Sequence, residues 1–177
     1  MRYSRLGYAV LALCTVLIAN PAPAQQPPNP ASPTAPSPAP LATNLQITLA
    51  ACNAFRAGDN ETAIAKADQC IRQFRDVADR IQTKLDAEKA TIPKGKVSPA
   101  EKRQVDQYEV LHDVARCFWI KGLAEEKLGH EEAAREAFTA TMKYKHARSH
   151  DPATDSFWSP AEKAAERLAR LKDAPTK

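Results

Sequence analysis

The chain has 177 residues, enough for one domain of ordinary size. Lys and Arg number 25 against 21 Asp and Glu, and this formal charge of +4 is too small to indicate a nucleic-acid-binding protein by charge alone. Because the sequence has no apolar run of about 20 residues, it predicts no ordinary transmembrane helix.

The segment 1–24 is typical of a secretory signal peptide. Arg2 and Arg5 give it a basic start, 6–19 is its apolar stretch, and 22–24 supplies the small residues that a signal peptidase requires. We therefore expect a periplasmic or secreted bacterial protein that keeps no membrane span after cleavage. An uncleaved anchoring helix is the alternative.

A proline-rich segment follows at 25–40. Seven of its sixteen residues are proline, and it carries no charge and no large apolar side chain. Since such a composition cannot repay the entropy lost on ordering, we expect an extended, disordered linker. Whether a proline-binding groove or the cell wall contacts this linker stays open.

The remainder, 41–174, is expected to be one all-α domain. It is rich in Ala, Glu, Lys and Arg, and its apolar residues recur at spacings of three and four. At 98–101 and again at 159–162, a serine, a proline and a glutamate combine into a helix start with a capping box. Five helices are predicted, at about 41–57, 60–91, 99–128, 131–145 and 159–172. The second and third are long enough to form an antiparallel hairpin of about 45 Å.

One part of this domain resembles a tetratricopeptide repeat (TPR). The motif has an aromatic residue and then a small one in its first helix, a turn, and Ala-x-x-x-Phe in its second helix. Phe118 and Gly122 match the first helix. Gly129 matches the turn, and Ala134 and Phe138 match the second helix. Small residues at these places let two helix backbones approach closely, while the rings fill the space beside them.

The match has departures and a weaker second copy. Lys121 and Glu125 stand where the motif has Leu and Tyr, and its closing proline is delayed to Pro152. The weaker copy lies upstream, around Gly58 and Ala63. The resemblance implies a TPR-like stack of antiparallel helix pairs, with the long hairpin between the copies and the last helix as a cap. A generic helical bundle is the alternative.

A TPR-like stack implies a non-enzymatic interaction module. Such a module binds another protein or a peptide in a groove lined by the first helix of each pair. We expect no nucleic acid as a partner. The predicted groove residues are Arg116, Trp119 and Leu123 from one unit and Thr48, Cys52 and Phe55 from the other. Ordinary packing is the alternative for all six. No H-E-x-x-H, phosphate-binding glycine loop or G-x-S-x-G motif occurs, so we expect no enzyme and no cofactor.

Two aromatic residues, Phe157 and Trp158, stand immediately before the last helix. They are expected to fold back on the preceding layer as a hydrophobic staple, or else to anchor a partner.

Three cysteines remain after the predicted cleavage: Cys52, Cys70 and Cys117. If the second and third helices turn back near Gly95, Cys70 and Cys117 lie within about one helical turn of each other. A disulfide between these two is one hypothesis, because export permits it, and buried free thiols are the other.

Two histidines, His146 and His150, are four residues apart and precede Asp151 and Asp155. On one helix face they would offer two imidazoles to a metal ion, whereas the basic residues around them favour a solvated turn. The alternative function is therefore an accessory metal- or small-molecule-binding envelope protein that uses the segment 146–155.

Overall fold

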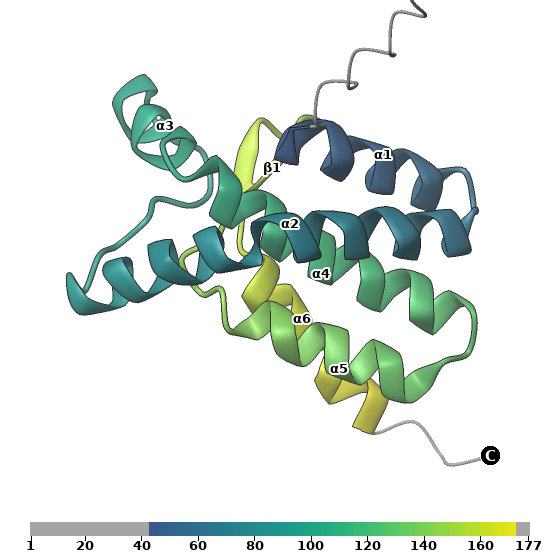
Figure 1. Cartoon of the computed structure of the whole chain (residues 1–177). Coiled ribbons are helices and arrows are strands. Elements are labelled where there is room, and N and C mark those ends of the chain that lie inside the picture. The colour runs from purple at the N-terminus through teal and green to yellow at the C-terminus, as the bar shows by residue number, and fades with distance from the viewer. Residues whose placement is uncertain (1–42, 173–177) are drawn as a thin grey trace, which may run out of the picture. The chain divides into compact units, whose positions relative to one another are not determined.

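The computed structural model describes residues 43–172, so the predicted signal peptide and proline-rich linker lie outside the described residues. The described part contains six helices and one two-stranded hairpin (Figure 1). In chain order these are α1 (Asn44–Arg56), α2 (Asn60–Ala87), α3 (Pro99–Asp106), α4 (Glu109–Lys127), α5 (Glu131–Met142), β1 (Ser149–Asp151), β2 (Ser156–Trp158) and α6 (Pro160–Lys172). The prediction of a mainly helical domain is confirmed, and the strand pair is an addition to it.

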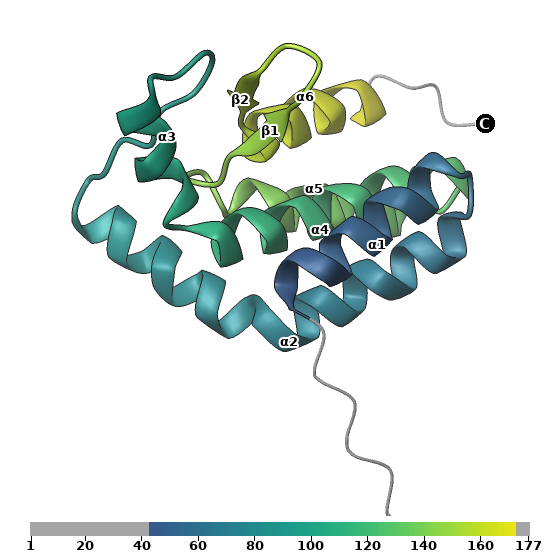
Figure 2. The same ribbon diagram turned by 90° about the horizontal axis from the view of Figure 1, so that it is seen from above.

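Consecutive long helices pack side by side. The helix α2 packs against both α1 and α4, α1 also contacts α4, and α5 packs against α4 and α6 (Figures 1 and 2). The short helix α3 projects away from these helices at one end, as Figure 2 shows. The hairpin lies near α3 and the start of α6, on the same side of α4 as α6.

Small side chains make the close packing of α1, α2 and α4 possible. Fully buried alanines lie on all three helices, among them Ala51, Ala67 and Ala115. Larger apolar groups such as Leu85 and Leu111 complete this core. Burial of such groups stabilises the fold by roughly 25 cal/mol for each Å² of apolar surface removed from water.

A second apolar cluster joins α4, α5 and α6. Its buried centre is Ala134, Phe138 and Ala164. A Cβ atom at Gly122 would lie 2.5 Å from the Phe138 ring, so only glycine lets that ring lie directly on the α4 backbone. The expected close approach at Gly122 and Ala134 is therefore found, with both residues buried.

Two predicted helix boundaries are wrong. The helix expected at 99–128 is divided, because the backbone at Tyr108 leaves the helical region (φ −113°, ψ 33°) and the His112 ring donates from Nε2 to the carbonyl of Val105 at 2.9 Å. The helix expected at 60–91 ends at Ala87, where Lys89 adopts a positive φ of 50°. The central hairpin is consequently formed by α2 and α4, with α3 outside it.

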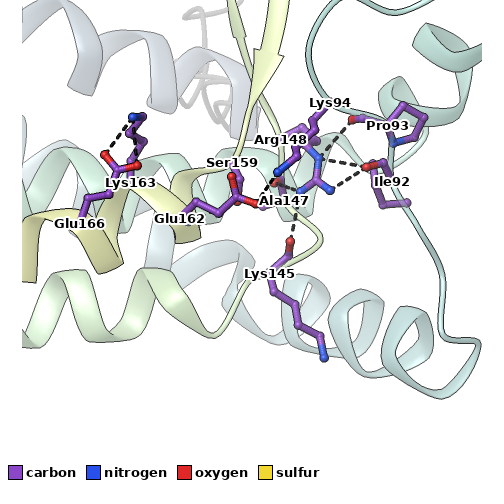
Figure 3. Close-up of polar contacts among 10 residues, drawn as sticks. All are labelled: Ile92, Pro93, Lys94, Lys145, Ala147, Arg148, Ser159, Glu162, Lys163 and Glu166. Carbon is purple, nitrogen blue, oxygen red and sulfur yellow. Dashed lines mark hydrogen bonds and ion pairs between the residues drawn. The ribbon is translucent and has the colours of Figure 1, made fainter.

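The connections at this end of the molecule are held by a buried arginine (Figure 3). The guanidinium of Arg148 donates to the carbonyl oxygens of Ile92, Pro93, Lys145 and Ala147, at distances between 2.6 and 3.2 Å. Only 9% of Arg148 is exposed, and burial lowers its pKa from the ordinary value. One side chain thus ties the α2–α3 connection to the α5–β1 connection.

The hairpin replaces the simple turn expected between the last two helices. Its strands are antiparallel, with His150 opposite Phe157. Asp151 and Pro152 begin its connecting turn, in which Asp151 accepts hydrogen bonds from the Ala153 N–H and the Thr154 hydroxyl. Phe157 also exchanges two backbone hydrogen bonds with Gly95, of 2.7 and 2.9 Å.

Candidate functional site

A cavity of about 570 Å³ is lined by residues of α1, α4 and the hairpin. Five of the six predicted groove residues line it, namely Cys52, Phe55, Arg116, Trp119 and Leu123. The two helices were therefore chosen correctly from the sequence, while the contribution of the hairpin was missed.

Thr48 is the exception among the predicted groove residues. It is fully buried, and its Oγ1 lies 3.3 Å from Cys117 Sγ and 3.6 Å from Cys70 Sγ. Since Thr48 faces α2 and α4 in the core, its assignment to the groove is wrong. The next residue, Leu49, lines the cavity and is 44% exposed.

The two cysteines predicted to pair, Cys70 and Cys117, do lie together, but both are free thiols. Each is buried and shares the hydroxyl of Thr48 as a neighbour. The pKa of Cys117 is raised, first by its hydrogen bond to Cys70 and then by burial. The same hydrogen bond lowers the pKa of Cys70, so Cys117 is the member of the pair that keeps its proton.

Two indole rings form the aromatic wall of the cavity. Trp119 of α4 packs on Phe138, with the ring centroids 5.3 Å apart. Trp158 of β2 meets Trp119 edge to face at 6.0 Å. The neighbouring residue Phe157 packs in the core instead, as a hydrophobic staple would. Of the two aromatic residues that could anchor a partner, only Trp158 lines the cavity.

The indole N–H groups are free donors. Neither Trp119 nor Trp158 has a hydrogen-bond acceptor for its ring nitrogen within residues 43–172. In the same residues no buried side-chain nitrogen or oxygen lacks a hydrogen-bond partner. Tryptophan of this kind, apolar in its ring and polar at its edge, is suited to an interface.

Two arginines add further donors to the cavity. The guanidinium of Arg116 is oriented by β1, because its Nε donates to Ser149 Oγ at 2.7 Å and its Nη2 reaches the carbonyl of His150 at 3.5 Å. Its Nη1 has no acceptor in the described part of the chain. Arg56 forms neither an ion pair nor a hydrogen bond there. The cavity is therefore rich in unused N–H groups.

Free acceptors are scarce by comparison. The carboxylate of Asp151, the one acidic group on the lining, accepts hydrogen bonds within its own turn, and these bonds lower its pKa. The ring of His150 is engaged by Asp155 at 3.0 Å. The cavity thus offers hydrogen-bond donors to an occupant.

Cys52 contributes little nucleophilic character to the cavity. Its burial raises the pKa of the thiol, and the nearby Arg116 and Arg56 oppose this shift only in part. Because the thiol and not the thiolate is present at neutral pH, Cys52 acts mainly as a small apolar surface.

A smaller hollow of about 140 Å³ adjoins the cavity, and the two share Arg116 and His150. It contains the carboxylates of Asp106, Glu109 and Asp113. Burial raises the pKa of Asp113. Arg116 and His150 therefore stand between a cavity that offers donors and a smaller, acidic hollow.

The two histidines considered as metal ligands have separate partners. The Nε2 of His146 bonds to Asp86 at 2.9 Å, whereas that of His150 bonds to Asp155. Across the described helices and hairpin, no three His, Cys, Asp or Glu side chains are placed to hold a metal ion. The segment 146–155 is a connection and a hairpin here, and it is not the single helix face that the metal hypothesis required.

No protein-family model matches the chain, and no curated protein and no solved structure is similar to it. Among the helices in residues 43–172, none has both the length and the apolar composition that crossing a membrane requires.

Proposed function

We propose that this protein is a non-enzymatic interaction module that binds a segment of another polypeptide in the cavity between α1, α4 and the hairpin. The observation that carries the proposal is the convergence of three aromatic side chains, Phe55, Trp119 and Trp158, with two arginines that form no ion pair within residues 43–172. They come from three elements far apart in the sequence. A volume of about 570 Å³ falls within the range of ordinary ligand sites.

The order of the helices supports a TPR-like stack as the frame of this site. The helices α1 and α2 form one antiparallel pair, α4 and α5 form the next, and α6 covers the last face. In this arrangement α1 and α4 are the first helices of their pairs, and they are the helices that line the cavity. The departures from the motif have roles of their own, since Lys121 pairs with Asp68 of α2 at 2.8 Å.

An extended occupant suits the shape of the groove. Residues of α1 from Leu49 to Arg56 and residues of α4 from Arg116 to Leu123 line the cavity, so an extended chain segment would lie between the two helices. We place this activity in the periplasm or outside the cell, as a scaffold of the bacterial envelope. The basic start, apolar stretch and small residues of the segment 1–24 support this location.

Selection from a random peptide library tests the proposal. The full chain should enrich a recognisable set of peptides, and the changes Leu49→Asp and Arg56→Glu should each abolish their binding. Both residues line the cavity and are exposed, so these variants should fold normally.

Matched controls are available on surfaces away from the cavity. Leu128→Asp and Arg80→Glu change an exposed leucine and an exposed arginine in the same way, and binding should persist in both. Peptides that bind all four variants equally would contradict the proposed site, and so would a selection that enriches none.

A further inference from the structure

The structure points to one class of occupant, and this inference rests on the proposed function. We propose that the cavity binds a proline-rich segment in the extended polyproline II conformation. The observation behind the proposal is that the cavity combines aromatic walls with an excess of unused hydrogen-bond donors.

The walls fit proline rings. Leu49, Phe55, Trp119 and Trp158 present apolar and aromatic surface from α1, α4 and β2. Grooves lined in this way hold proline-rich segments, because the flat indole faces pack against pyrrolidine rings and the rigid segment loses little entropy on binding.

The polar groups fit the backbone of such a segment. Proline has a carbonyl and no N–H, so a polyproline II helix brings unpaired acceptors and few donors. The cavity has the opposite excess, in the guanidinium groups of Arg56 and Arg116, which form no ion pair within residues 43–172. The single carboxylate on its lining, that of Asp151, accepts two hydrogen bonds within its own turn.

Two other occupants fit these features less well. An amphipathic helix satisfies its backbone carbonyls internally, so it would leave the donors of the cavity unused. An acidic segment would be attracted to Arg56 and Arg116, but it would meet Asp151 and the acidic hollow next to Arg116, and it would leave the aromatic walls without apolar partners.

The chain itself supplies a suitable probe in its sequence. Residues 25–40 are uncharged and contain seven prolines, so a peptide of this sequence, blocked at both ends, has the required chemistry. Two comparison peptides carry Ala or Glu in place of all seven prolines. The first removes the ring and the stiffness, and the second supplies an acidic segment of equal length.

Tryptophan fluorescence reports occupancy directly, because the only two tryptophans of the chain, Trp119 and Trp158, both line the cavity. The three peptides are titrated against the full chain and against a full-length variant in which the prolines of 25–40 are alanine. This variant removes competition from the prolines of the chain itself. The proline peptide should shift the emission of at least one of these proteins and bind at least about tenfold more tightly than the alanine peptide.

Two substitutions connect binding to the cavity. Trp158→Phe keeps an aromatic ring and removes one N–H donor, and Leu49→Ala trims the apolar wall. Each should weaken binding of the proline peptide by about tenfold, whereas Leu128→Ala should leave it unchanged. Circular dichroism checks that every variant is folded.

The proposal is overturned if the proline peptide binds neither protein, or binds no more tightly than the alanine peptide. If the glutamate peptide or a library peptide then binds in a way that Leu49→Ala weakens, only the choice of occupant fails and the proposed function stands. If no peptide shows binding that depends on the cavity residues, the proposed function fails as well.

Discussion

The helical stack and the junction at its end are stabilised by different means. Among the packed helices, stability depends on how apolar side chains fill the available volume. The Phe138 ring, for example, fills the space left by Gly122. In the junction, single side chains bind the backbone: Arg148 donates to four carbonyls, and His112 joins Val105 to the N–H of Arg148. The stack should therefore tolerate exchanges of similar volume, while the junction depends on particular donors and acceptors.

Removing the ring at Phe138 should have the largest effect on stability. Phe138→Ala leaves a cavity between α4 and α5, and we expect the free energy of unfolding to fall by about 4 kcal/mol. Phe138→Leu keeps much of the volume and should cost about 1.5 kcal/mol. Urea unfolding at pH 7 measures both. Equal losses for the two variants would show that volume is not what holds this part of the stack.

Removing the guanidinium of Arg148 should have the next largest effect. Arg148→Met leaves the carbonyls of Ile92 and Ala147 without their donor, at a cost of about 3 kcal/mol. Arg80→Met, at an exposed position, should change stability by less than about 0.5 kcal/mol. Compared with the wild type, Arg148→Met should increase the rate of amide hydrogen exchange more in the two connections than in α1 and α2. A variant as stable as the wild type would show that the buried guanidinium is dispensable.

The junction should also be the pH-sensitive region. The ring of His112 accepts from the Arg148 N–H at Nδ1 and donates at Nε2, so it is neutral, and burial lowers its pKa to about 4. Its pKa in the unfolded chain is about 6.5. Because the unfolded state binds the proton first, stability should fall as the pH decreases from about 6.5 to about 4, by about 3 kcal/mol.

Comparison with His112→Gln isolates this effect from the carboxyl groups that titrate in the same range. The variant lacks the titrating ring, so its free energy of unfolding should decline less over this pH interval. Parallel curves for the two proteins would show that His112 does not carry the pH dependence.

The difference between the packed helices and the junction also explains which parts of the fold could be predicted from the sequence. The helical class was predictable, because buried alanines and rings repeat at helical spacing and because Ser98 and Glu101 form the capping box that their spacing indicates. The division at Tyr108 was not predictable, since it depends on His112 reaching Val105, and no local pattern encodes that contact.

The candidate site was predictable to the extent that helices build it. The resemblance to a TPR, in which the first helices of each pair line a groove, placed Phe55, Trp119 and Arg116 there. It also placed Thr48 there, one turn from Cys52, although Thr48 is buried in the core. The hairpin was missed, although Asp151 followed by Pro152 is a common way to begin a turn. Without the hairpin, neither Leu49 nor Trp158 could be recognised as part of the cavity.

The backbone pairing of Gly95 with Phe157 has a consequence for how the cavity is held together. One side of the cavity belongs to the rigid helices, whereas Trp158 stands on a short strand whose other neighbour is the α2–α3 connection. Loosening that connection would let this ring swing away while the helices stay folded. An occupant in contact with the ring would in turn protect the connection from proteases. The rate of proteolytic cleavage near Gly95 would then report whether the cavity is occupied.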